Sequence, residues 1–299
     1  MSKREFIARY GLIINKLRRG PVSFDELDFF LQNQSSVDGY NYSISQRTFQ
    51  RDIKDIEHIH KIFIKYDHAN KVYYIANEED DKLGQRMLEA FDLFNAFNTP
   101  ERISQHIHFE SRRPQGTDNL HGILHGIKNG FEVAFTYTKY WDDKVSERTV
   151  QPYALKEFKN RWYLVCNDLK DNRIKTFGLD RLTDLEITRK GFEIPTSFDV
   201  GEHFKYCFGI ISPNAQKPEE VVLSFTVFQG KYIKSLPLHH TQQVLIDNEE
   251  ELRIKLKVFI TEDFVMEIIS HGERVKVLEP KSFANEIRSI HEAAAERYL

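Results

Sequence analysis

Apolar residues recur with a helical period through the first 60 positions of the chain. Residues 5 to 18 form the first predicted helix, which ends at Gly20-Pro21. Ser23 and Glu26 form a capping box that predicts the start of a second helix. A third predicted helix begins after this pair, at Ser45, and its apolar stripe is formed by Phe49, Ile53 and Ile56.

Two short runs with strand-like alternation, KIFIKY and KVYYIA, follow the third helix. The residues between them, Asp67 to Asn70, favour a turn, so the two runs predict a hairpin. Three helices followed by a hairpin is the order of a winged helix-turn-helix. We assign residues 1–76 to such a domain.

The middle of the chain changes from a helical to a strand-like pattern. A broad apolar face predicts a helix over residues 81–98, whereas residues 99–116 have no period and predict a connection. Another helix is expected over 119–128. The runs EVAFTY, RTVQPYALKEF, RWYLVCND and IKTFGLD then predict a small antiparallel barrel. We assign 77–129 to a helical linker or dimerisation region and 130–190 to the barrel.

The last third of the chain mixes both patterns. Residues 191–218 are a connection rich in Phe and Gly. Residues 219–299 alternate strand-like and helical runs and are long enough to form an α+β domain of their own. The predicted fold class is therefore multidomain α+β.

Composition is that of an ordinary water-soluble protein. The 299 residues are 40% hydrophobic and 29% charged, with a net charge of −3. The two cysteines, Cys166 and Cys207, have no metal-knuckle spacing and suit a reducing compartment. Because no signal-peptide core or long apolar run is evident, we expect a cytoplasmic protein.

The third predicted helix carries the clearest candidate chemistry. Its hydroxyls and cations suit phosphate, and its amide and guanidinium groups suit base edges in a major groove. The predicted DNA-binding residues are Ser45, Gln46, Arg47, Thr48, Gln50, Arg51, Lys54 and, from the hairpin, Lys71. Residues 1–75 contain 12 Lys or Arg and 9 Asp or Glu, a net +3, so the remainder carries −6. The alternative is an amphipathic helix with routine surface charge.

Several motifs together resemble one family. ISQRTFQRDIKDIE is similar to the recognition-helix segment of winged helix-turn-helix modules in bacterial transcription regulators. Trp162-Tyr163-Leu164 is the tripeptide for which WYL-domain regulators are named. Gln242 and the run HGERVKVLEP resemble the extension domain that follows WYL. The other matching positions, in the family's order, are Phe135, Tyr137, Arg148, Pro152, Arg173, Phe177, Leu179, Asp180 and Arg181.

The resemblance implies a small Sm-like or SH3-like β-barrel that senses a ligand, followed by a ferredoxin-like α+β extension. The implied ligand-binding residues are Tyr137, Arg148, Trp162, Tyr163, Arg173 and Arg181. Arginines grip phosphate and aromatic rings stack on bases, so this set suits a flat anionic ligand, such as a nucleotide or single-stranded nucleic acid.

Alternatives exist for several of these residues. Trp162 and Tyr163 point to opposite faces of a strand, so one of them is expected in the core, and Trp162 is the stronger candidate. Arg148 and Arg181 could be paired with acidic residues. Gly178 stands where the family often has a basic residue, which predicts a smaller or less basic pocket.

The predicted function is that of a bacterial transcription regulator that binds operator DNA as a homodimer and responds to an anionic ligand. The alternative is a nucleic-acid-binding accessory protein that regulates an enzyme partner. His121 and His125 lack a third ligand, and Cys166 lacks a histidine partner in sequence. We therefore expect no metal, no cofactor, no membrane association and no enzymatic activity.

Overall fold

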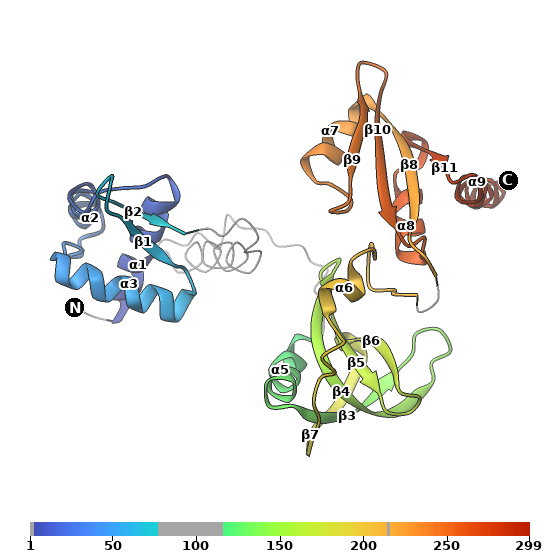
Figure 1. The fold of residues 1–299 in the computed structure, drawn as a ribbon, viewed down its shortest axis with the longest axis horizontal. Coiled ribbons are helices and arrows are strands. Elements are labelled where there is room, and N and C mark those ends of the chain that lie inside the picture. Colours follow the sequence, from blue (N-terminus) through green and yellow to red (C-terminus); the bar gives the residue numbers. More distant parts are fainter. Residues whose placement is uncertain (1–2, 77–115, 214–215) are drawn as a thin grey trace. The chain divides into compact units, whose positions relative to one another are not determined.

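A computed structural model of the chain describes residues 3–76, 116–213 and 216–299. The chain divides into two compact units, Met1–Glu110 and Ser111–Leu299, each considered separately below (Figure 1). Both units mix helices and antiparallel strands, so the multidomain α+β class is confirmed. The helix predicted over 81–98 lies outside the described residues, as does nearly all of the connection predicted over 99–116. The finer division into five segments stays a prediction.

The first unit contains three helices and a hairpin in the predicted order. These elements are α1 (Lys3–Arg18), α2 (Phe24–Asp38), α3 (Gln46–His60), β1 (Ile64–Asp67) and β2 (Val72–Ile75). Strands β1 and β2 are antiparallel, and an isolated bridge joins Val22 to Tyr73. The predicted stripe of α3 is buried with the inner faces of α1 and α2 in one apolar core.

Capping groups set the ends of these helices as the sequence predicts. Ser23 and Glu26 form both hydrogen bonds of the capping box at the start of α2. The Ser45 hydroxyl accepts a hydrogen bond from the Thr48 amide at the start of α3. The helix ends at Lys61, whose left-handed backbone turns the chain into the hairpin.

The second unit begins with a five-stranded antiparallel sheet in the order β6-β5-β4-β3-β7. Helix α5 (Leu120–Asn129) packs against it and buries Ile123 among the strand side chains. A short helix, α6 (Val200–Phe204), follows the sheet. The strands are β3 (Phe131–Thr138), β4 (Val145–Phe158), β5 (Arg161–Asp168), β6 (Arg173–Gly178) and β7 (Leu182–Gly191).

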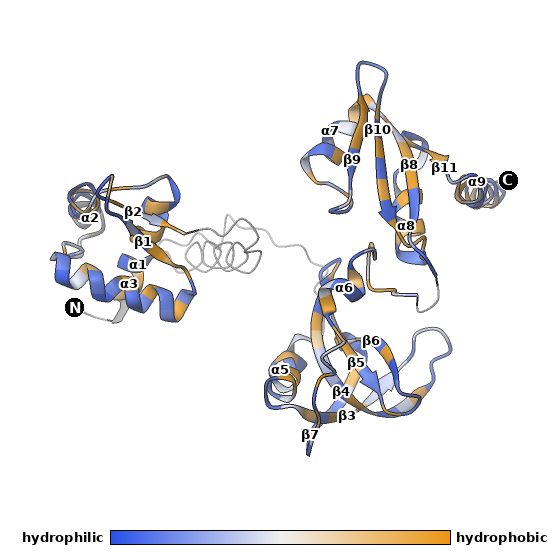
Figure 2. Ribbon diagram, in the orientation of Figure 1, coloured by the Kyte–Doolittle hydropathy of each residue, from blue (hydrophilic) through white to orange (hydrophobic). Residues whose placement is uncertain are grey.

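A second antiparallel sheet, in the order β11-β8-β10-β9, forms the rest of this unit. Hydrophobic and hydrophilic residues alternate along β10, because one of its faces lies on the core (Figure 2). The strands are β8 (Glu219–Thr226), β9 (Gln243–Asp247), β10 (Glu251–Val258) and β11 (Val275–Glu279), and the helices are α7 (Val227–Ser235), α8 (Glu262–Ser270) and α9 (Lys281–Glu296).

Asp263, near the start of α8, links this second sheet to the segment that follows α6. Its Oδ2 accepts hydrogen bonds from the Ile210 amide at 2.8 Å and the Ile211 amide at 3.1 Å. Gly209 packs so closely that a Cβ there would lie 2.3 Å from the same oxygen. The backbone of residues 209–211 is therefore shaped around one carboxylate.

Candidate nucleic-acid interface and ligand site

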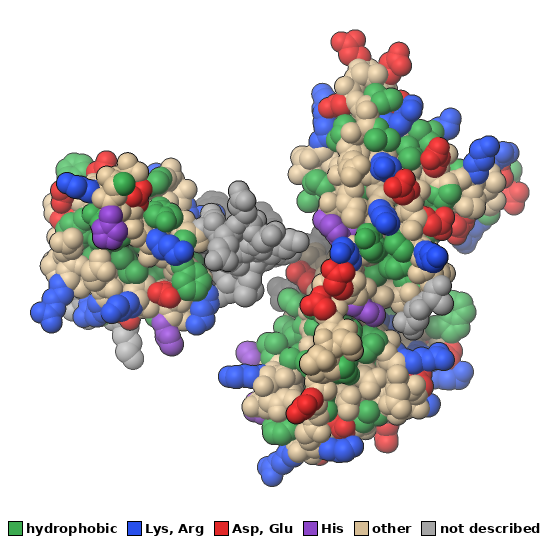
Figure 3. All heavy atoms as spheres, viewed as in Figure 1, with side chains coloured by type: hydrophobic (Ala, Val, Ile, Leu, Met, Phe, Trp, Pro, Cys, Tyr) green, Lys and Arg blue, Asp and Glu red, His purple; other side chains and the backbone are tan. Residues whose placement is uncertain are grey.

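Helix α3 presents its polar side chains to solvent along one face. Of the predicted DNA-binding residues, Thr48 is half-buried and the others are exposed. Lys and Arg side chains are spread along the edge of the unit that carries α3 (Figure 3). Gln50 is held in place, because its amide nitrogen donates to the Tyr73 hydroxyl on β2 at 3.0 Å. The face therefore combines exposed cations with one amide that is fixed against the hairpin.

Contacts on the inner face of α3 fix the direction of its outer face. Asp52 is fully buried and accepts two hydrogen bonds from Arg9 on α1. The Tyr10 hydroxyl donates to Asp55 at 2.9 Å. The Arg51 guanidinium lies 5.9 Å from the Phe6 ring centroid and remains largely exposed. These contacts join α3 to α1 at three positions, Arg51, Asp52 and Asp55, and the remaining predicted residues of α3 face outward.

The tip of the β1–β2 hairpin is closed by Asp67. Its carboxylate accepts hydrogen bonds from the Ala69 amide at 2.8 Å and from the Asn70 side chain at 2.7 Å. Bonds with Asn70 are the main reason that the pKa of Asp67 is lowered. Lys71 then follows in a left-handed backbone conformation and is exposed. The turn thus holds its acid in local hydrogen bonds and projects a cation.

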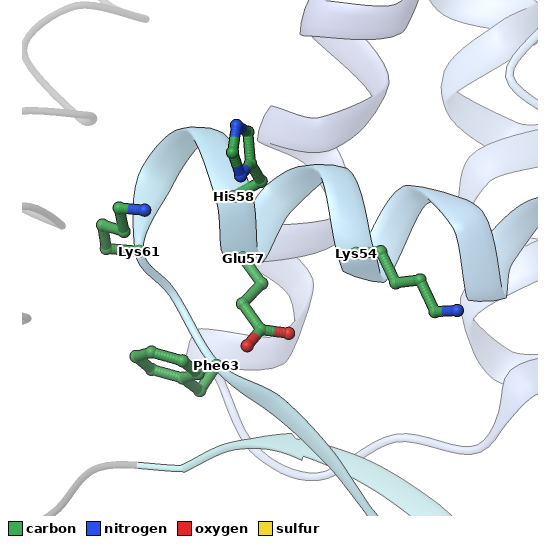
Figure 4. Close-up of a pocket in the computed structure, with 5 residues that line it drawn as sticks. All are labelled: Lys54, Glu57, His58, Lys61 and Phe63. Atoms are coloured by element: carbon green, nitrogen blue, oxygen red, sulfur yellow. The ribbon is translucent and has the colours of Figure 1, made fainter.

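A hollow of about 420 Å³ lies at the C-terminal end of α3, opposite the end that begins at Ser45 (Figure 4). It is lined by Lys54, Glu57, His58, Lys61 and Phe63. Lys54 is the one predicted DNA-binding residue among them. The other predicted positions on α3 lie nearer the start of the helix, so this hollow is separate from most of the candidate interface.

In the second unit, Arg181 lies between two aromatic rings. Its guanidinium carbon is 5.3 Å from the Tyr137 centroid and 5.0 Å from the Tyr140 centroid. The Tyr137 hydroxyl accepts a hydrogen bond from the Gly178 backbone, and burial raises its pKa. Because Gly178 has no side chain, the guanidinium can fold over this strand: a Cβ there would lie 2.8 Å from Nη2 of Arg181.

Asp180 sits beside Arg181 with unsatisfied hydrogen-bonding capacity. Its Oδ2 accepts from Arg161 Nη1 at 3.2 Å. Its Oδ1 is 3.8 Å from Arg181 Nε, too far for a hydrogen bond, and both atoms are buried. Neither atom has a hydrogen-bond partner among the described residues. A buried donor and acceptor left unpaired cost about 1–3 kcal/mol each, which a bound polar ligand can recover.

The two aromatic residues of the Trp-Tyr-Leu tripeptide face opposite ways. Trp162 is half-buried against the core of the five-stranded sheet, together with Leu164 and Cys166. Tyr163 pairs in register with Gly178 and is near Arg161, Asp180 and Arg181. Burial raises the pKa of Tyr163. The structure therefore brings Tyr163, Tyr137 and Arg181 together and directs Trp162 to the core face.

Arg148 and Arg173 lie at the other end of β5. Arg148 is buried, with Nη1 3.1 Å from Asp168 Oδ2 and Nε donating to Ser146 at 3.1 Å. Lys175 also donates to Asp168, at 2.7 Å. Arg173 pairs with Asp168 in register and is exposed. Five residues of strand separate Asp168 from Tyr163, about 17 Å, so Arg173 is distant from Tyr163. Arg148 approaches the cluster from another side, because Ser146, to which it donates, pairs in register with Tyr137.

Sequence reasoning missed two members of that cluster. Tyr140 is in the β3–β4 turn, and Arg161 directly precedes the tripeptide. Asp180 belongs to the segment Phe177 to Arg181 that resembles the family, but it was not predicted as a site residue. The sequence signals for these residues were an aromatic ring at Tyr140, soon after Tyr137, and a basic side chain at Arg161, beside Trp162. Their contacts with Arg181 and Asp180 depend on how the strands pair, which the motif does not encode.

The remaining titratable groups form no further catalytic constellation in the described part of the chain. Burial raises the pKa of the Cys166 thiol well above its ordinary value, so the group is held as a neutral thiol. Within residues 3–76, 116–213 and 216–299, no three His, Cys, Asp or Glu side chains are placed to hold a metal ion. None of the helices in those ranges is long and apolar enough to cross a membrane.

Comparison with known proteins defines the class to which these features belong. The WYL domain model matches residues 118–187, which span α5 and the five-stranded sheet through most of β7. The WCX domain model matches residues 217–295, which span the second sheet and its helices. The chain thus contains a WYL domain followed by a C-terminal WCX domain.

Solved structures are similar only in part. Proteasome accessory factor B/C (PafBC) of Arthrobacter aurescens is 16% identical with a TM-score of 0.37; the match covers 98% of this chain and 47% of that one. The chain therefore spans about half the length of that protein. A CRISPR Cas-related protein is 14% identical with a TM-score of 0.38, covering 97% and 91% of the two chains. No curated protein matches.

Proposed function

We propose that the protein is a transcription regulator that binds duplex operator DNA through α3 and the β1–β2 hairpin and responds to an anionic ligand in its WYL domain. The N-terminal unit acts as a winged helix-turn-helix, and the five-stranded sheet as a small Sm-like barrel. The observation that carries this proposal is the outward polar face of α3, held by the buried Arg9–Asp52 pair.

The chemistry of α3 supports contact with DNA rather than with water alone. Arg47, Arg51 and Lys54 provide cations for phosphate, and Gln46 provides an exposed amide for a base edge. Ser45 and Thr48 hydroxyls lie at the positive end of the helix dipole, where phosphate is favoured. Gln50 belongs to the same face, and its hydrogen bond to Tyr73 ties the hairpin to α3.

The Arg181 cluster supports the ligand response. We place the ligand beside Tyr137, Tyr140, Arg161, Tyr163 and Arg181, where aromatic faces adjoin two guanidinium groups. Asp180 Oδ1 and Arg181 Nε, which are buried without a hydrogen-bond partner, can form hydrogen bonds with a polar ligand. Arg148 is instead assigned to the buried ion pair with Asp168, because its guanidinium already has two partners. Arg173 and Trp162 are likewise left out of the proposed ligand site.

A homodimer follows from the same proposal, since helix-turn-helix proteins match two half-sites to a two-fold axis. A single α3 also offers few cations. Affinity for DNA should therefore depend on two copies of the N-terminal unit acting together.

The proposal is tested by measuring binding to the DNA upstream of the protein's own gene by fluorescence anisotropy at fixed salt. The double substitution Arg47→Glu and Arg51→Glu should weaken binding at least tenfold, because two phosphate or base contacts become repulsive. The matched control is Arg189→Glu with Arg297→Glu, two exposed residues of the second unit, which makes the same change in net charge. Equal binding by both double variants would exclude α3 as the DNA-reading element.

A ligand response is tested in the same assay. Mononucleotides and short oligonucleotides are added to the protein–DNA complex, and the dissociation constant for duplex DNA is measured with each. Arg181→Ala should keep the basal duplex affinity and lose the response. Loss of oligonucleotide binding in Arg181→Ala, combined with no duplex binding in the wild type, would favour the accessory-protein alternative.

A further inference from the structure

The turn between β3 and β4 carries two exposed aromatic side chains. Tyr140 is 60% exposed and Trp141 is 96% exposed. Val145, the first residue of β4, is exposed as well. Leaving a whole indole in water forgoes the free energy that contact with another apolar surface would provide. This turn therefore has an aromatic surface that is not buried by the folding of the described residues.

Local interactions hold the turn in one shape. The Lys139 amide donates to the Lys144 carbonyl at 3.1 Å and closes the loop. The Lys144 amide donates to Asp142 Oδ1 at 3.3 Å, and Lys144 Nζ lies 2.8 Å from Asp142 Oδ2. Trp141 is thus presented by an ordered turn, so less entropy is lost when it binds a ligand.

The turn adjoins the cations of the proposed ligand site. The Arg181 guanidinium rests on the ring of Tyr140, the residue before Trp141. Arg161 holds the neighbouring Asp180 and is itself exposed. Of the two acids in the turn, Asp142 is paired with Lys144, and Asp143 is exposed to solvent. Aromatic faces next to guanidinium groups are the arrangement that holds unpaired bases and their phosphates.

We infer that Tyr140 and Trp141 form a stacking surface for the unpaired base of a single-stranded oligonucleotide whose phosphate contacts Arg181. The inference rests on the proposed ligand site and specifies the class of ligand that this site takes. A protein partner would need a larger contiguous apolar patch, whereas here two adjacent aromatic residues are flanked on both sides by charged residues. Those charged residues are Lys139, Asp142, Asp143 and Lys144.

The chain contains two tryptophans, which allows a direct test. In a Trp162→Phe variant, Trp141 is the sole indole, and a short oligothymidylate should quench its fluorescence on binding. In the Trp162-containing protein, Trp141→Ala should weaken oligothymidylate binding at least fivefold by anisotropy, because one stacked base is lost. Trp141→Phe should restore most of the affinity. Phe228→Ala on α7, which removes another exposed ring, is the matched control.

The outcomes separate this inference from the proposed function. If Trp141→Ala binds oligothymidylate like the wild type while Arg181→Ala does not, the stacking surface is wrong and the ligand site stands. Binding of a mononucleotide or phosphate but not of the oligonucleotide has the same meaning. If neither substitution changes binding, both proposals fail. Loss of self-association in Trp141→Ala would show that the turn is a protein contact and would overturn the inference.

Discussion

Arg9 and Asp52 form a fully buried, bidentate ion pair between α1 and α3. The two hydrogen bonds measure 2.7 and 3.0 Å, and neither side chain is exposed to solvent. Asp52 lies among the core residues Phe49, Ile53 and Ile56, so the pair fixes which side of α3 faces inward. A charged pair in this position is a poor source of net stability, but it opposes other rotations of the helix strongly.

Removing one partner of this pair should destabilise the N-terminal unit severely. Asp52→Ala leaves the Arg9 guanidinium buried without its carboxylate, and we expect a loss of about 3–5 kcal/mol. Hydrogen exchange of the α1 and α3 amides in the full chain measures this locally. The double variant Arg9→Met with Asp52→Leu should recover much of the loss, since two apolar side chains replace the pair. Failure of the double variant to recover would mean that the pair itself supplies the stability.

Gly178 should prove necessary for the position of Arg181. In Gly178→Lys the new Cβ would lie 2.8 Å from Arg181 Nη2 and 2.7 Å from Asp180 Oδ1, so both side chains must move. We expect about a tenfold loss of oligonucleotide affinity, equivalent to ~1.4 kcal/mol. Gly178→Ala should cause most of the same loss, because the Cβ alone makes the clash. Tighter binding by Gly178→Lys would show that an added cation outweighs the displaced guanidinium.

Arg148 and Arg181 should respond to substitution in different ways. Arg148→Ala leaves the buried Asp168 with Lys175 as its partner in an ion pair and the Lys170 amide as a further donor, and we expect about 3 kcal/mol of destabilisation. Thermal unfolding followed by the fluorescence of the two tryptophans, Trp141 and Trp162, measures it. Arg181→Ala removes a partly exposed guanidinium and should change the unfolding temperature little while it abolishes the ligand response. The reverse pattern would place the ligand at Arg148 instead.

Helical period and capping residues predicted the N-terminal elements well, because these signals are local. The start of α3 at Ser45 and the limits of β5 around the Trp-Tyr-Leu tripeptide agree with the sequence analysis. The sequence analysis did not predict strand β7, because its sequence, LTDLEITRKG, lacks a clean alternation of apolar and polar residues. In the structure, register shifts interrupt its pairing with β3, and Asp184 and Arg189 adopt left-handed backbone conformations.

The candidate ligand site was predictable only in part, for a physical reason. Tyr137, Tyr163 and Arg181 stand in recognisable motifs, but their grouping depends on which residues face each other across strands. Tyr163 pairs with Gly178 at one end of β5, and Arg173 pairs with Asp168 at the other end. The strand register therefore separates ligand-binding residues that the sequence analysis had grouped together. Arg148 is also set apart by its burial. It forms an ion pair with Asp168, twenty residues further along the chain, and residue type alone does not reveal this pairing.

The Asp263 carboxylate should be needed to order residues 209–211. Asp263→Ala removes the acceptor for the Ile210 and Ile211 amides, and we expect a loss of about 1–3 kcal/mol. Hydrogen exchange at these two amides should rise, whereas the amides of β3 should stay protected. Asp263→Asn is the matched control, because a single oxygen, Oδ2, accepts both bonds and an amide oxygen in its place can still do so. Unchanged exchange in Asp263→Ala would show that Gly209 alone sets the loop.

Acid should weaken the second unit through His239. This side chain is buried, with Nδ1 2.8 Å from the Thr241 hydroxyl, and burial lowers its pKa from 6.5 to about 4. Between those two values the unfolded chain binds a proton that the folded chain excludes, so stability falls as the pH decreases from 6.5 towards 4. His203 and His271 act in the same direction, because burial lowers the pKa of each.

Urea unfolding of the full chain at pH 7, 6, 5 and 4, followed by Trp162 fluorescence, measures this dependence. His239→Gln cannot take up the proton, so its stability should decline less over this range than that of the wild type. The exposed His121 offers no comparable burial, and His121→Gln should decline like the wild type. Parallel curves for the wild type and His239→Gln would mean that the acid sensitivity comes from other groups, such as the carboxylates.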